Sequence, residues 1–173
     1  MKLKLSEMAS IAEVIGAFAV VVSLIYVGVQ VNDSTRAVRA ASANDANVAV
    51  QSWCHEVGSD QQTSELFYRI LMNGKPESAA EEFQFMMMFQ GAFLAFQNSF
   101  LLAQEGTIDA ELHDGLTGAI LIVKDTPGMA LYWPQRRITL HPDFVAYVDD
   151  LIERDAETTM DIYRTSDADG GQE

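Results

Sequence analysis

Two aromatic residues, two arginines and a histidine lie close together near the C-terminal end of the chain. They are Tyr132, Trp133, Arg136, Arg137 and His141, within the stretch YWPQRRITLHPDF. A guanidinium group binds an anion through paired hydrogen bonds and stacks on aromatic faces. The segment is therefore a candidate site for an anionic or planar ligand. The alternative, which we favour, is structural: the arginines pair with acidic residues or reach lipid phosphates, and the segment folds onto neighbouring helices.

Few other residues have the types and spacing that suit catalysis or metal binding. The three histidines, His55, His113 and His141, stand in no His-x-x-x-His or Glu-x-x-His arrangement, the spacing expected of a helical di-metal centre. The sequence also lacks a Gly-x-Ser-x-Gly motif, a phosphate-binding glycine loop and a dinucleotide fingerprint. No catalytic residue is identified, and no metal or cofactor is predicted.

A single cysteine and a row of acidic residues are the remaining candidates for chemistry. Cys54 is the only cysteine, so no internal disulfide can form. Its neighbour His55 points about 100° away on a helix, and we therefore interpret Cys54 as a small apolar residue near a helix interface. Glu153, Glu157 and Asp161 share one helix face. We interpret them as a solvated acidic surface and not as a cation site.

Composition limits the class of protein and its partners. The chain has 173 residues, of which 49% are hydrophobic, so one compact domain with an anchor is expected. Its formal net charge is -14. Nucleic-acid binding depends on basic side chains that displace phosphate counterions, and two isolated arginine pairs cannot supply them. We predict no nucleic-acid partner.

An apolar stretch near the N-terminus, EVIGAFAVVVSLIYVGVQ, bears on where the protein resides. Residues 14–29 are sixteen positions without a charge. A helix rises about 1.5 Å per residue, so this stretch and its flanks nearly cover the roughly 30 Å hydrocarbon layer of a bilayer. We predict an uncleaved transmembrane helix over residues 10–31. A secretion signal needs a small-residue cleavage site, for which YVGVQVND is a poor match; a core helix of a soluble bundle is the other alternative.

Small or hydrogen-bonding side chains recur on one narrow face of the predicted span. Steps of three and four residues meet Ala12, Gly16, Ala19 and Ser23, and the stepping continues as far as Gln51. Small residues let helix backbones approach closely in a bilayer, and this spacing is that of a left-handed helix pair. We predict a helix-packing interface on this face. The alternative is that an alanine-rich span produces such a stripe by chance.

The remaining sequence predicts helices and no sheet, because no apolar alternation of period two persists. The first helix continues without proline or glycine to Trp53. Phe85, Phe89, Phe93, Phe96 and Phe100 recur at helical spacing and are interpreted as a core face, the alternative being a groove for a lipid or other hydrophobic ligand. Later helices are expected over residues 59–74, 79–105, 107–125 and 143–164. The first of these has Ser59 or Asp60 as its N-cap and ends at Asn73-Gly74, and Ser78 with Glu81 forms a capping-box pattern before the second. Residues 126–142 hold three of the four prolines and are expected to be a loop containing at most one helical turn.

These predictions combine into an all-α fold in which a long transmembrane helix continues into a small helical bundle. The expected organisation is an N-terminal segment (1–9), the transmembrane helix (10–31), a helical domain (32–164) and a disordered acidic tail (165–173).

Three stretches carry a resemblance: EVIGAFAVVVSLIYVGVQVNDSTRAVRA, FQNSFLLAQEGTIDAELHDG and LHPDFVAYVDDLI. Together they resemble a family of uncharacterised bacterial proteins that join one N-terminal hydrophobic helix to a small helical domain. The resemblance implies this architecture and a bacterial inner-membrane location, and it carries over no catalytic residue. The family's usual basic cluster after the span is reduced here to Arg36 and Arg39.

The predicted role is that of a membrane-anchored structural or interaction subunit. Its expected partners are membrane lipid and either further copies of the chain or other membrane-protein subunits. The alternative is a membrane-anchored enzyme or ligand sensor that uses the Tyr132–His141 segment. Basic residues do not decide the orientation, since Lys2 and Lys4 precede the span and two arginines follow it; the resemblance favours a cytoplasmic helical domain.

Overall fold

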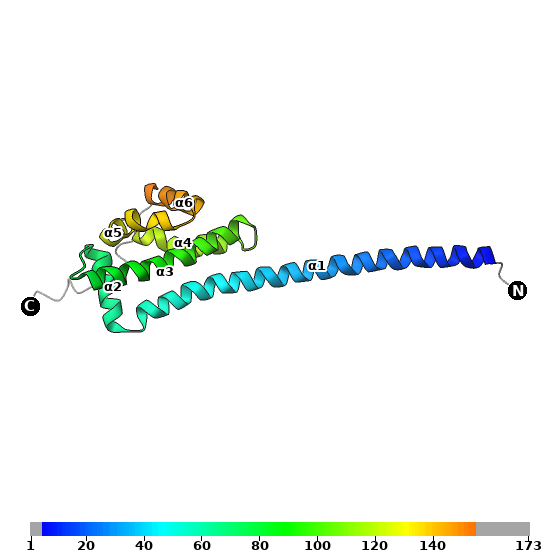
Figure 1. Ribbon diagram of the computed structural model, residues 1–173, viewed down its shortest axis with the longest axis horizontal. Helices are drawn as coiled ribbons and strands as arrows, with labels where there is room; N and C mark the ends of the chain where they lie inside the picture. Colours follow the sequence, from blue (N-terminus) through cyan, green and yellow to red (C-terminus); the bar gives the residue numbers. More distant parts are fainter. Residues whose placement is uncertain (1–4, 155–173) are drawn as a thin grey trace, which may run out of the picture. The chain divides into compact units, whose positions relative to one another are not determined.

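The computed structural model describes residues 5–154, and every regular element within that range is a helix. The all-α prediction is confirmed for this part of the chain (Figure 1). The expected tail at 165–173, and the part of the last predicted helix beyond Arg154, lie outside the described residues. The elements are α1 (Leu5–Gly58), α2 (Gln61–Asn73), α3 (Ala79–Gln104), α4 (Ala110–Val123), α5 (Pro127–Arg136), the 3-10 helix η1 (Arg137–Thr139) and α6 (Pro142–Glu153).

The chain divides into two compact units, and the boundary falls inside α1 between Ala41 and Ser42. The first unit contains α1 up to Ala41. The second contains the last turns of α1 together with α2 to α6. The predicted continuation of the first helix to Trp53 is confirmed, since α1 runs on to Gly58.

In the first unit, the apolar stretch of α1 is exposed. The helix is long and apolar enough to cross a membrane, and none of its most apolar window is buried. Val14 and Phe18 are each 70% exposed. Helix α3 passes the same test of length and composition, but more than half of its window is buried inside the second unit, as expected of a core helix.

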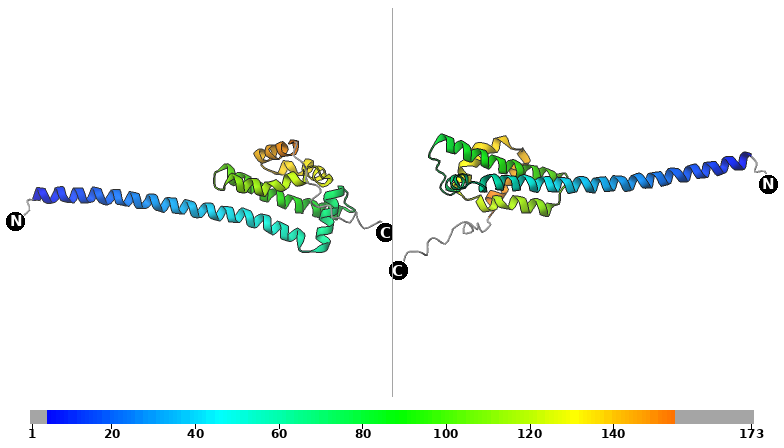
Figure 2. Two further views of the ribbon diagram at one scale, coloured as in Figure 1. Left: turned by 180° about the vertical axis from the view of Figure 1, so that it is seen from behind. Right: turned by 90° about the horizontal axis from the view of Figure 1, so that it is seen from below.

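In the second unit, α3 is the central helix, and α2, α4, α5 and α6 all pack against it (Figures 1 and 2). The predicted core face is confirmed, because all five phenylalanines of the row are buried. Phe85, Phe89 and Phe93 follow one another with ring centroids 5.3 and 5.4 Å apart. Fully burying one such side chain contributes about 1.5–3 kcal/mol. The row is therefore a main source of the stability of this unit.

The last turns of α1 join this core through Ala46, Val50, Trp53 and Val57. The Trp53 indole N–H donates a 2.6 Å hydrogen bond to the Met88 carbonyl of α3. Val50 of this packing face stands one position before Gln51, where the small-residue stripe continues. Cys54 is not part of the packing face. Cys54 is exposed, so its predicted position near a helix interface is wrong.

Helices α2 and α3 begin and end where the sequence predicted, because their caps satisfy free backbone groups. The Asp60 carboxylate accepts a 2.8 Å hydrogen bond from the Thr63 amide, and α2 ends at Gly74, whose φ of 65° favours glycine. The Ser78 hydroxyl accepts from the Glu81 amide at 3.2 Å.

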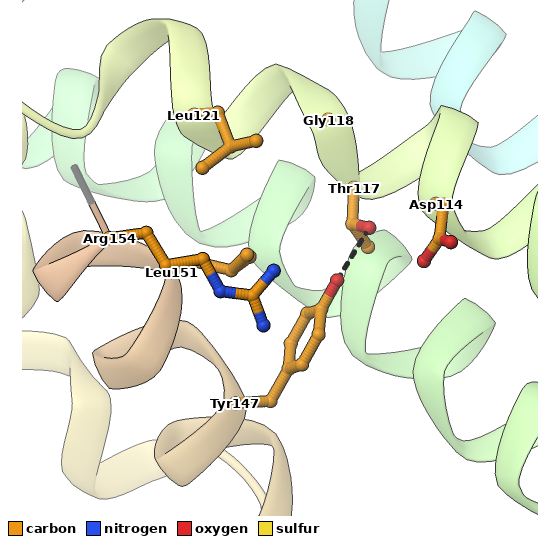
Figure 3. Close-up of a pocket in the computed structure, with 7 residues that line it drawn as sticks. All are labelled: Asp114, Thr117, Gly118, Leu121, Tyr147, Leu151 and Arg154. Atoms are coloured by element: carbon orange, nitrogen blue, oxygen red, sulfur yellow. Dashed lines mark hydrogen bonds between the residues drawn. The ribbon is translucent and has the colours of Figure 1, made fainter. Parts of the chain in front are cut away.

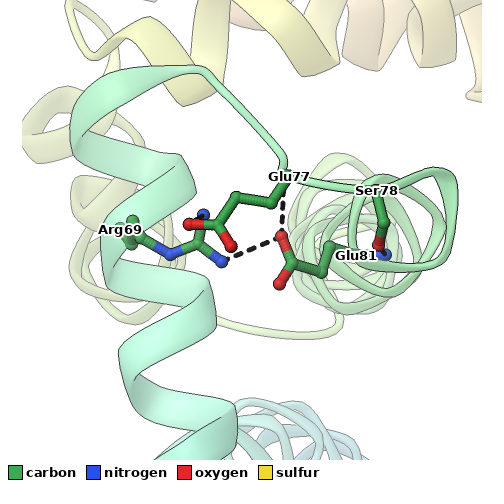
Figure 4. A network of polar contacts seen from close by, with 4 residues as sticks. All are labelled: Arg69, Glu77, Ser78 and Glu81. Atoms are coloured by element: carbon green, nitrogen blue, oxygen red, sulfur yellow. Dashed lines mark hydrogen bonds and ion pairs between the residues drawn. The ribbon is translucent and has the colours of Figure 1, made fainter.

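The carboxylate of Glu81 completes this turn differently from a capping box (Figure 4). It accepts from the Glu77 amide at 2.8 Å and not from that of Ser78, and it pairs with Arg69 of α2, also at 2.8 Å. The hydrogen bond from Arg69, followed by that from the Glu77 amide, lowers the pKa of Glu81. The ion pair thus links the start of α3 to α2.

The loop predicted over residues 126–142 is largely helical, and this prediction is wrong. Thr126 caps α5 by accepting from the Met129 amide at 3.1 Å, and Pro127 and Pro142 stand in the first turns of α5 and α6. Proline suits a first helical turn because the amide that it lacks would have no helical partner there. Two of the prolines taken as signs of a loop therefore mark helix starts, and only Pro134 lies inside a helix.

Close packing of α2 on α5 requires glycine at position 128. A Cβ atom at Gly128 would lie 2.5 Å from the Leu71 Cα atom and 3.0 Å from its carbonyl oxygen. We expect Gly128→Ala to lower the free energy of unfolding by about 1–3 kcal/mol, because two backbones must separate. The measurement is denaturant unfolding of the full chain followed by circular dichroism.

Gly115→Ala is the matched control for this prediction. A Cβ atom at Gly115 in α4 meets nothing within 4 Å, and alanine favours a helix over glycine by roughly 0.5–1 kcal/mol. This variant should be as stable as the parent chain or slightly more stable. Equal effects of the two substitutions would contradict the close α2–α5 contact.

Candidate functional site

Trp133 and Arg137, two of the residues predicted to form a ligand site, meet at the carboxylate of Asp149 on α6. The Trp133 indole N–H donates to Asp149 Oδ1 at 2.9 Å, and Arg137 forms an ion pair with Oδ2 of the same carboxylate. The guanidinium also lies over the Trp133 ring, 5.6 Å from its centroid. Both charged partners are about a third exposed or more. The arrangement ties α5 and η1 to α6.

Tyr132, Arg136 and His141 do not join this cluster. Tyr132 is fully buried, and its hydroxyl donates to Gln90 Oε1 of α3 at 2.9 Å. Burial raises the pKa of Tyr132, and Arg136 offsets this in part. His141 caps α6: its Nδ1 accepts from the Asp143 amide at 3.3 Å. Four of the five residues therefore serve three separate contacts, and the five line no common cavity among those described.

A shallow cavity of about 550 Å³ lies beside this segment but gathers only one of the predicted residues. Arg137 lines it together with two prolines and several aliphatic side chains. One of the aliphatic side chains is that of Ile138, which is 87% exposed. The guanidinium of Arg137 is already neutralised by Asp149. An anionic ligand at this place would compete with that carboxylate for the same donor.

A second, more polar cavity of about 140 Å³ lies between α4 and α6 (Figure 3). Thr117 and Tyr147 face each other across it through a 2.9 Å hydrogen bond between their hydroxyls. Asp114 and Arg154 also line it, and Arg154 Nε donates to Asp150 at 2.9 Å. The cavity is large enough for a few water molecules. Its hydroxyl and charged groups suit water or a small polar molecule.

Ser99 and His113 form a buried pair next to this cavity. Their Oγ and Nδ1 atoms are 3.2 Å apart, a spacing at which a histidine can activate a serine nucleophile. Ser99 is completely buried, however, and no substrate can reach it. Burial lowers the pKa of His113, an effect that Asp114 partly opposes. The imidazole packs between Phe100 and Tyr147, so the pair joins α3, α4 and α6 structurally.

Among residues 5–154, no group of three or more His, Cys, Asp or Glu side chains is placed to hold a metal ion. Glu153 is the only member of the predicted acidic row inside that range; Glu157 and Asp161 lie outside it. Comparison of the chain with protein-family models, with curated proteins and with solved structures gives no match.

Several residues that define these sites were not predicted from the sequence. Asp149 decides the surroundings of Trp133 and Arg137 but lies in a run of acidic residues, DDLIERD, that gives no sign of a buried partner. Thr117 and Tyr147 stand 30 positions apart. The spacing of Tyr147 three and four residues from Phe144 and Leu151 does indicate an inward face, and it could have singled out Tyr147.

Replacing Asp149 tests whether the cluster is structural. Asp149→Ala leaves the buried Trp133 indole N–H and the Arg137 guanidinium without their partner. We expect a loss of about 1–3 kcal/mol in the free energy of unfolding, because unsatisfied groups are costly. Asp150→Ala is the control: its partner Arg154 is an exposed residue directly after α6, and such surface pairs contribute less than about 1 kcal/mol. The free energies of unfolding of both variants are measured with denaturant. A loss in Asp149→Ala no larger than that in Asp150→Ala would contradict the structural role.

Proposed function

We propose that this chain is a single-span membrane protein, in which residues 10–31 anchor a helical domain that acts as a structural or interaction subunit. The observation that carries the proposal is the exposure of the apolar part of α1. Between Val14 and Val31, twelve large apolar side chains are each about half exposed or more.

The free-energy cost of leaving this surface in water is large. Fully burying a large apolar side chain contributes about 1.5–3 kcal/mol, so twelve side chains exposed by half to two thirds leave roughly 10–20 kcal/mol unrealised. The whole stability of a typical domain is about 5–15 kcal/mol. A bilayer removes this cost, and it accepts a helix because all interior backbone groups are paired within the segment.

The small-residue stripe supports assembly through the same segment. A Cβ atom added at Gly16 meets nothing within 4 Å, so a second helix can approach the backbone there. The Ser23 hydroxyl donates to the Ala19 carbonyl at 2.8 Å and needs no other partner. Ala12, the fourth residue of the predicted interface, continues the same spacing in the sequence. Helix pairs in lipid are driven by such close packing, and we propose self-association or pairing with another membrane subunit.

The alternative, a ligand sensor built on the Tyr132–His141 segment, is less well supported. Asp149 already satisfies Trp133 and Arg137, and Tyr132 is committed to Gln90. The helical domain is proposed to face the cytoplasm of a bacterial cell, on the inner membrane. This orientation rests on the family resemblance, because the family's usual basic cluster follows the span, where this chain has Arg36 and Arg39.

Membrane attachment is tested by an alkaline carbonate wash of membranes from cells that express the full chain. We expect the chain to remain in the pellet, because only lipid burial of the apolar segment resists the wash. A double variant in which both Val21 and Ile25 are changed to Arg places two charges at the centre of the predicted span. Each charge costs about 2.5–3.5 kcal/mol there. That variant should appear in the supernatant. Recovery of the unaltered chain in the supernatant would overturn the proposed location.

The packing stripe is tested by a bulky substitution on and off the predicted face. Gly16→Leu should reduce the oligomeric fraction seen by cross-linking after mild detergent extraction at least tenfold, because leucine keeps two backbones apart. Gly28→Leu is the matched control. It makes the same change in the same helix, and its Cβ atom also meets nothing within 4 Å, but it lies off the stripe. Equal loss of oligomers in both variants, or in neither, would remove the stripe as the interface.

A further inference from the structure

An apolar cavity of about 270 Å³ lies within the second unit, between the end of α1, α2, α3 and α4. Trp53 and Val57 of α1 form one wall, Phe67 and Met72 belong to α2, and Phe89 lies on α3. Helix α4 contributes the opposite wall through three small or aliphatic side chains, which are Ala119, Ile122 and Val123. Four helices thus surround one space that the predicted ligand segment does not touch.

Polar side chains are few in the lining of this cavity, and they are those of Ser64, Trp53 and Tyr68. None of its lining residues is charged. The Ser64 hydroxyl donates to the Val57 carbonyl at 2.7 Å, and the Trp53 indole N–H donates to the Met88 carbonyl. A charge placed there would lose its hydration without compensation. The wall therefore selects for uncharged, apolar groups.

Aromatic packing holds the cavity open. The rings of Trp53 and Phe67 meet edge to face at 5.7 Å, and those of Phe67 and Phe89 at 5.6 Å. Edge-to-face contacts of this kind are favourable arrangements in their own right, so the rings do not need to collapse into the space. Ala119 is exposed beside the cavity, and its neighbourhood gives a ligand access from solvent.

The volume sets the size of the group that fits. An apolar cavity of about 150 Å³ stays dry and binds benzene, with six non-hydrogen atoms. By the same proportion, a space of about 270 Å³ takes roughly ten such atoms. A hydrocarbon chain of eight carbons with one small neutral group has this size.

We propose that the cavity formed by α1, α2, α3 and α4 is a binding site for the uncharged hydrocarbon part of a small molecule. The site takes a chain of about eight to ten non-hydrogen atoms, scaled from a cavity of known occupancy. The formal net charge of -14 repels anionic amphiphiles, so a neutral head group such as an alcohol is preferred over a carboxylate. The inference does not depend on the membrane location of the protein.

Contact quenching of tryptophan fluorescence tests the site directly. The probe is 8-bromo-1-octanol, whose bromine quenches an indole only at contact range, and the protein is the full chain in zwitterionic nanodiscs. In a Trp133→Phe variant, where only Trp53 emits, we expect saturable quenching. In a Trp53→Phe variant, where only Trp133 emits, no saturable quenching is expected. Circular dichroism verifies that each variant is folded.

Ala119→Phe, made in the Trp133→Phe background, fills the cavity from α4 and should raise the half-saturating concentration at least tenfold. Ala130→Phe is its matched control, because Ala130 is an exposed alanine of α5 that lines no described cavity; it should leave the value unchanged. Quenching that does not saturate, or that Ala119→Phe leaves unaltered, would overturn the proposal. So would saturable quenching that appears only after truncation behind Arg154, because the chain's own C-terminal segment would then be the occupant.

Discussion

The second unit depends on the burial of one row of phenylalanine side chains along α3. Each surrounding helix contributes an apolar face to this row: Phe67 from α2, Tyr132 and Trp133 from α5, and Phe144 from α6 all contact it through ring pairs. Direct contacts between the surrounding helices add to this common surface, above all the close approach of α2 and α5 at Gly128. Their polar links, such as Arg69 with Glu81 and Trp133 with Asp149, lie at the edges of this surface and orient the helices around it.

Helix α1 meets two different requirements in two different parts. In its last turns, Ala46, Val50 and Trp53 face the core of the second unit. In the first unit, a Cβ atom added at Gly16 of the small-residue stripe meets nothing within 4 Å. The stripe therefore need not be consumed by folding of the second unit, and it stays available for another helix in the proposed assembly.

Much of the fold could be predicted because it depends on local signals. The cap residues Asp60 and Ser78, the terminating Gly74 and the phenylalanine period of α3 each act over a few positions. The α5 helix was missed because its prolines were taken as breakers, although Pro127 stands where a helix starts. Cys54 was misplaced because the packing face of α1 is set by contacts with α3, which no local pattern records.

The surroundings of the candidate sites were less predictable than the helices. A single acidic side chain, Asp149, decides what Trp133 and Arg137 contact, and it is 16 positions away from the indole. The apolar cavity is formed by residues from four helices, so its existence follows from how those helices pack. Sequence periodicity shows which residues face inward, but it does not show where inward-facing side chains fail to fill the space between them.

Trp53 belongs to both the packing of α1 and the wall of the apolar cavity. Its indole N–H attaches α1 to α3, and the same ring borders the space between α2 and α4. A ligand in that cavity would contact Trp53, which attaches the end of α1 to α3. Ligand binding and the stability of this α1–α3 contact are therefore thermodynamically coupled.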